Sequence, residues 1–115
     1  MTTGISKATS TGYCGGVSCA EVVARALALV ADKWSVPVLE ALAFAPGPAR
    51  FRELQRRIGA ITQKELSRQL TRFVHHGVVR RDSDPLHLMR VSYRLTERGR
   101  GLLTQLDRMG QWVQS

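Results

Sequence analysis

The sequence has little that would suit a membrane protein, a secreted protein or an enzyme. It has no apolar run close to the roughly 20 residues that a membrane span needs. Its first residues, MTTGISKATS, lack the basic start and continuous apolar segment of a secretory signal. No Gly-rich phosphate loop follows an expected strand, and no pair of carboxylates lies in an apolar setting. These absences predict a cytoplasmic protein with no enzymatic activity.

Cysteine is also scarce, since Cys14 and Cys19 are the two in the chain. Neither has a nearby His or third Cys to complete a tetrahedral ligand set, so we expect no metal and no cofactor. In a reducing cytoplasm a structural disulfide is not expected. Two alternatives stay open for these residues: inert thiols, or thiols that sense an oxidant or an electrophile.

Acidic residues are few relative to basic ones, and the imbalance is local. The chain has 17 Lys and Arg against nine Asp and Glu, a net charge of +8. Thirteen of the basic and five of the acidic residues lie between Arg50 and Arg100, so this segment holds the whole net charge. Twelve of the thirteen are Arg, whose planar guanidinium suits phosphates and guanine edges. A basic surface that only faces solvent could have the same composition. The concentration of positive charge in one segment nevertheless favours binding to nucleic acid.

The 115 residues are enough for one domain. Residues 1–18 are rich in Gly, Ser and Thr and are expected to form a flexible arm, with one folded domain over residues 19–115. Apolar residues recur at helical spacing over 20–31, again from Trp34 until the break at Pro46, and then over a short segment that ends at Gly59.

The clearest local signal is a capping box over residues 62–65. The Thr62 hydroxyl can accept from the Glu65 N–H while the Glu65 carboxylate reaches back. A helix is therefore expected from Gln63 to about His76, with Gly77 as a left-handed C-terminal cap. Its expected buried stripe consists of Leu66, Leu70, Phe73 and Val74.

Two segments rich in β-branched and aromatic residues follow this helix, 78–81 and 90–95, and they predict a two-stranded ribbon. Thr96 then caps a last helix that continues almost to the C-terminus. The expected fold is mainly α with a small β wing, a winged helix-turn-helix. In that geometry the second helix of the pair enters the major groove of double-stranded DNA.

The solvent face of the helix after Thr62 carries the residue types that DNA recognition uses. Cations there can neutralise phosphates, while short polar side chains can bond to base edges. The residues expected to contact DNA are Lys33, Thr62, Gln63, Lys64, Ser67, Arg68, Thr71, Arg72 and, in the wing, Arg90.

Several ordered segments closely resemble the HxlR-type transcriptional regulators. They are Lys33-Trp34, Arg50-Phe51-x-x-Leu54, Ile61-Thr62-x-Lys64-x-Leu66-x-x-x-Leu70, Gly77-Val78-Val79-Arg80-Arg81 and Val91-x-Tyr93-x-Leu95-Thr96-Glu97-x-Gly99. The resemblance implies a homodimer formed through the first and last helices, which reads a pseudo-palindromic operator.

The resemblance also implies a small oxidant or electrophile as effector, acting at Cys14 or Cys19. The family's cysteine comes slightly later in the chain, where this sequence has Glu21. One alternative stays open for the whole protein: a winged-helix module that binds protein without binding DNA. Such a module should expose an apolar patch on the helix that here carries cations.

Overall fold

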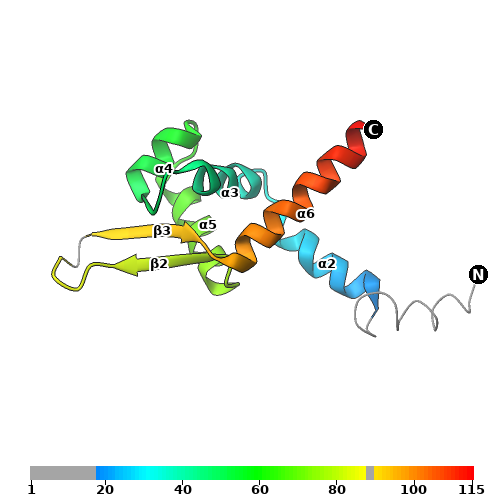
Figure 1. Cartoon of the computed structure of the whole chain (residues 1–115), viewed down its shortest axis with the longest axis horizontal. Coiled ribbons are helices and arrows are strands. Elements are labelled where there is room, and N and C mark those ends of the chain that lie inside the picture. The colour runs from blue at the N-terminus through cyan, green and yellow to red at the C-terminus, as the bar shows by residue number, and fades with distance from the viewer. Residues whose placement is uncertain (1–17, 88–89) are drawn as a thin grey trace, which may run out of the picture. The chain divides into compact units, whose positions relative to one another are not determined.

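The computed structural model describes residues 18–87 and 90–115 (Figure 1). The expected arm therefore lies outside the described residues, apart from Ser18 at its end. The chain divides into two compact units, one that ends at Lys33 and one that spans Trp34–Ser115. The first unit contains the helix α2 (Cys19–Val30), which buries none of its residues.

The second unit holds the winged helix-turn-helix that the sequence predicts. Its elements, in chain order, are α3 (Ser35–Phe44), β1 (Ala49–Arg50), α4 (Phe51–Ile58), α5 (Gln63–His75), β2 (Val79–Ser83), β3 (Val91–Leu95) and α6 (Glu97–Gln114). Each expected helix and strand of this unit is present, with ends within a few residues of those predicted. The fold class is confirmed.

The sheet has one strand more than the sequence indicates. Its order is β1-β3-β2, and all pairs are antiparallel. The additional strand β1 pairs Ala49 with Tyr93 and Arg50 with Ser92. A strand of two residues between Pro48 and a helix has no periodicity of its own, so it forms only because β3 offers an edge.

β2 and β3 form the wing. Their register runs from Val79 opposite Leu95 to Ser83 opposite Val91, so β2 extends further than the expected 78–81. Figure 1 shows the two strands projecting side by side from the helices of their unit. The expected loop is correspondingly displaced toward the C-terminus, because Asp82 and Ser83 pair with β3.

The core lies where α3, α4 and α5 meet the base of the sheet. Its fully buried apolar side chains come from all three helices and from the base of the sheet, and include Val38, Leu39, Leu54, Leu66, Phe73, Val78 and Val79. These residues fix the orientation of α5 relative to α3 and α4.

One member of the expected α5 stripe is wrong. Val74 is 36% exposed, whereas the polar Gln69 is 0% exposed. Gln69 lies about 60° from Leu66 around the helix axis, and Val74 lies about 80° away on the other side. The neighbouring helix α3, whose Ser35 touches Gln69, lies on the Gln69 side and decides which flank is buried.

The last helix, α6, is anchored at its start and uncovered further on. Thr96 caps it by accepting from the Gly99 N–H at 3.0 Å, and Gly99 is its one buried residue. Met109, Trp112 and Val113 are 52%, 77% and 71% exposed. Among the described residues, none of the helices combines the length and apolar character that a membrane span would need.

Candidate nucleic-acid interface

Local sequence fixes both ends of α5, the second helix of the helix-turn-helix. At its start the Thr62 hydroxyl accepts from the Glu65 N–H at 3.1 Å, as predicted. At its end Gly77 adopts a φ of 73°, a left-handed conformation that side chains with a Cβ rarely adopt. These caps hold a helix of 13 residues that starts and stops at defined points.

The Glu65 carboxylate, which the capping box predicts to reach back toward the start of the helix, has a different partner. The Glu65 carboxylate bonds to the Arg68 guanidinium at 2.8 Å, three residues further along the helix. The Glu65 carboxylate could accept from a backbone N–H group or pair with a cation three residues away, and in this structure it pairs with Arg68. Both partners are partly solvated, at 48% and 32% side-chain exposure, so the pair contributes little to stability.

The predicted DNA-contacting side chains of α5 lie together on its outward face. Those of Thr62, Gln63, Lys64, Ser67, Arg68 and Thr71 are exposed. Within residues 18–87 and 90–115 Lys64 has no ion-pair partner. The face therefore presents cations and short hydrogen-bonding groups to the same side, which is the combination that phosphates and base edges require.

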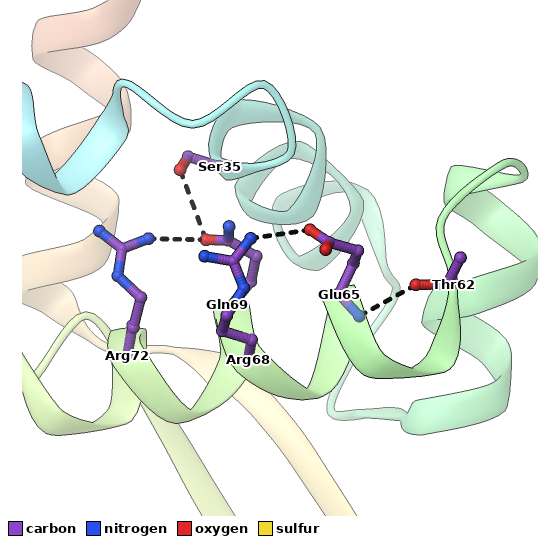
Figure 2. A network of polar contacts seen from close by, with 6 residues as sticks. All are labelled: Ser35, Thr62, Glu65, Arg68, Gln69 and Arg72. Carbon is purple, nitrogen blue, oxygen red and sulfur yellow. Dashed lines mark hydrogen bonds and ion pairs between the residues drawn. The ribbon is translucent and has the colours of Figure 1, made fainter.

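Arg72 differs from the others because it is half-buried. One of its terminal guanidinium nitrogens donates to the side-chain oxygen of Gln69 at 3.0 Å. The Ser35 hydroxyl, from the start of α3, donates to the same oxygen at 3.4 Å. Figure 2 shows the Gln69 amide between these two groups. Helical periodicity placed Gln69 at the border of the buried face, so the sequence alone gave no sign of its role.

The two remaining predicted contacts lie outside α5. Arg90 is exposed and directly precedes β3, the return strand of the wing. Two other arginines of the wing, Arg80 and Arg94, both pair with Asp82, at 2.8 and 3.5 Å, which lowers their net charge toward a ligand. Lys33 is exposed and is the last residue of the first unit. It therefore stays a predicted DNA contact that is not grouped with the residues of α5.

The expectation of free thiols is wrong for Cys19. This residue, the first of α2, is disulfide-bonded, and no described cysteine is free. Cys14, the other candidate, lies outside the described residues. The expectation came from the redox state of the compartment, whereas a disulfide also depends on how close two cysteines come in the folded chain, which sequence spacing does not give. Among the described residues, no group of three or more His, Cys, Asp and Glu could hold a metal ion.

Comparison with known proteins gives a family match over most of the chain. The model of the HxlR-like helix-turn-helix family matches residues 29–115. An uncharacterized HTH-type transcriptional regulator of Halalkalibacterium halodurans is 38% identical over 86 residues, which is 75% of this chain and 75% of the relative.

Solved structures of transcriptional regulators superpose on this chain. A protein assigned to the MarR family of transcriptional regulators, from Enterococcus faecalis, superposes with a TM-score of 0.76 at 29% identity, over 85% of this chain and 87% of that one. The diamide-treated form of the regulator YodB from Bacillus subtilis gives a TM-score of 0.73 at 27% identity, over 85% and 94%. YodB is also known in a quinone-bound form, which superposes with a TM-score of 0.69 at 28% identity, over 82% and 97%.

Proposed function

This chain belongs to the HxlR-like helix-turn-helix family, and on that premise we propose that it binds double-stranded DNA as a homodimer and regulates transcription. The observation that carries the proposal is the outward face of α5. Lys64, Arg68 and Thr71 are exposed together on a helix whose ends are capped and whose opposite face is buried. A helix of this kind, followed by a wing, is the element that enters the major groove in helix-turn-helix proteins.

The two kinds of side chain on this face have different roles in the proposal. Lys64 and Arg68 bind phosphates, and they set the register and much of the affinity. Thr62, Gln63, Ser67 and Thr71 face base edges. Arg90 contacts the DNA from the wing, and Lys33 makes a further contact to the DNA backbone. A protein-binding module would instead expose an apolar patch here, and the exposed residues of α5 are polar or charged apart from Val74, which is 36% exposed.

The homodimer is proposed from uncovered apolar residues on the first and last described helices, α2 and α6. Met109, Trp112 and Val113 of α6 are at least half exposed, and Val23 and Leu27 of α2 are nearly so, at 47% and 46%. Apolar side chains repeated along a helix in this way are typical of an interface. A two-fold dimer presents two α5 helices and therefore reads a pseudo-palindromic operator.

The proposal can be tested with duplexes that the protein selects from a random-sequence library. We expect two protected half-sites whose centres lie about 34–36 Å apart, or a multiple of that helical repeat. Light scattering of the free protein should give twice the mass of the 12.8 kDa chain. Enrichment of no sequence above the starting library would contradict DNA reading, and a monomer that binds the selected duplex normally would contradict the dimer.

We also propose that Cys19 responds to oxidants or electrophiles. It is disulfide-bonded at the start of α2, a helix proposed for the dimer interface. A reductant that supplies two electrons and two protons converts this disulfide to two thiols, and diamide accepts the same electrons and protons to restore it. Opening the disulfide frees the start of α2 and shifts it at the dimer interface, which changes the spacing of the two α5 helices.

This redox proposal has a direct test. We expect diamide to change the affinity of reduced wild-type protein for the selected duplex by a factor within the roughly 5–150-fold range of allosteric coupling. Cys19→Ser should not respond, and Cys14→Ser separates an effect of the second sulfur. If wild type and Cys19→Ser respond equally, Cys19 is not the sensor.

A further inference from the structure

Gln69 is a polar residue in a place where an apolar one would serve stability better. It is 0% exposed and lies beside the core residues Leu66, Leu70 and Phe73 on α5. Its side-chain nitrogen is buried and has no hydrogen-bond partner among the described residues. A buried amide with an unsatisfied N–H group costs free energy, while a leucine of similar volume has no polar group of its own that could be left unsatisfied. Stability alone therefore does not account for this glutamine.

The oxygen of the same amide is fully used. It accepts from the Arg72 guanidinium at 3.0 Å and from the Ser35 hydroxyl at 3.4 Å. Ser35 is itself 0% exposed, at the start of α3. In Figure 2 the chain of contacts runs from Ser35 through Gln69 to Arg72. The head group of an arginine on the reading helix is thus attached to a buried atom that α3 also holds.

The orphan nitrogen follows from this arrangement. If the amide were turned over, its NH₂ group would face the guanidinium of Arg72, and two donors would oppose each other. The oxygen must therefore face Arg72, and the nitrogen must take the position without a partner. The unsatisfied group is the cost of presenting an acceptor to Arg72.

The other cations of α5 are held differently. Arg68 pairs with the solvated carboxylate of Glu65, and exposed pairs of this kind exchange readily with water. Lys64 has no ion-pair partner within the described residues. The head group of Arg72, by contrast with this solvated pair, bonds to a side chain with no solvent exposure.

We propose that Gln69 is a positioning residue that orders the Arg72 side chain in the free protein, so that Arg72 meets a DNA phosphate without first losing its conformational freedom. Ser35 fixes the Gln69 amide in turn. The inference rests on the proposed function of α5 and deepens it. A guanidinium carries five N–H donors, and one of those of Arg72 donates to Gln69. Ordering a long side chain on binding is a cost that this arrangement removes.

The test is a pair of double-mutant cycles on the duplex that wild type selects. Gln69→Leu should weaken binding about three- to tenfold for each half-site of the dimer, the cost of immobilising one long side chain. In the Arg72→Ala background Gln69→Leu should have no further effect, because there is no side chain left to order. In the Lys64→Ala background, the matched control, Gln69→Leu should keep its full effect.

A purely structural role predicts a different pattern. Thermal unfolding of Gln69→Leu should change little, since the substitution removes an unsatisfied buried N–H group but also removes the acceptor of the buried Ser35 hydroxyl. Gln69→Met, which is more flexible, provides a second variant if Gln69→Leu packs poorly. Ser35→Ala should give a smaller loss that also vanishes in the Arg72→Ala background.

Three results would overturn the proposal. Equal losses in the Arg72→Ala and Lys64→Ala backgrounds would mean that Gln69 acts through the fold. Unchanged binding by Gln69→Leu would mean that Arg72 needs no ordering, and tighter binding would mean that Gln69 withholds Arg72 from DNA. Failure of the proposed function looks different, because the wild-type protein itself would then select no duplex.

Discussion

Lys64→Ala and Arg68→Ala should each weaken duplex binding strongly while helicity and thermal unfolding stay nearly unchanged. Both side chains are exposed, and neither contributes to the core. Lys64 has no ion-pair partner within the described residues, and the pair of Arg68 with Glu65 is solvated. Their removal therefore costs the folded protein little, whereas a DNA complex loses a contact in each half-site.

The form of the loss tells which role each residue has. A lost phosphate contact lowers affinity on all sequences and reduces the salt slope by roughly one unit, whereas a lost base contact costs about 1–3 kcal/mol on the selected duplex alone. Titrations at several salt concentrations, on the selected duplex and on a shuffled one, measure both quantities. Arg68→Ala should also release the Glu65 carboxylate, which adds a repulsive charge near the phosphates.

Arg108→Ala is the matched control for these two variants. It removes the same charge from an exposed position on α6, outside the basic segment from Arg50 to Arg100. Binding by Arg108→Ala should stay close to that of wild type. If all three variants lose affinity equally, only net charge matters and α5 is not the reading helix. If Lys64→Ala and Arg68→Ala both bind as wild type does, the assignment of α5 is wrong.

Gly99→Ala should destabilise the fold by about 3 kcal/mol, at the upper end of the cost of forcing an additional methyl group into a packed site. A Cβ at this position would overlap the backbone carbonyl oxygen of Val78 and lie 3.1 Å from a methyl carbon of Leu95. The carbonyl belongs to backbone at the base of the sheet, and it also accepts from the Thr96 N–H at 3.0 Å. The backbone at Val78 and the capped start of α6 cannot move apart without breaking the hydrogen bond between Thr96 and Val78.

Thermal or denaturant unfolding measures this effect, and Gly101→Ala is its control. Gly101 lies in the same helix, and a Cβ there would have no atom within 4 Å. Gly101→Ala should therefore stabilise the protein by about 0.5–1 kcal/mol, the usual gain from replacing glycine within a helix. Equal stability of the Gly99→Ala and Gly101→Ala variants would show that α6 does not dock through Gly99.

Local signals in the sequence were sufficient to place most helices and their ends. Thr62 and Thr96 cap α5 and α6 as predicted, and Gly77 ends α5 with a positive φ. Such signals act over three or four residues, through bonds between a side chain and the nearest free N–H groups. Helical periodicity likewise placed Lys64 and Arg68 on the outward face, because a face is a property of the helix alone.

Only the tertiary structure decided which residues at the border of a face are buried and what they touch. Gln69 is enclosed and Val74 is exposed because α3 lies against one flank of α5, and nothing in the α5 sequence specifies that neighbour. The same holds for β1, which depends on the edge of β3, and for Gly99, which depends on the Val78 carbonyl. Burial and strand pairing are set by segments distant in the chain, so periodicity within one segment cannot predict them.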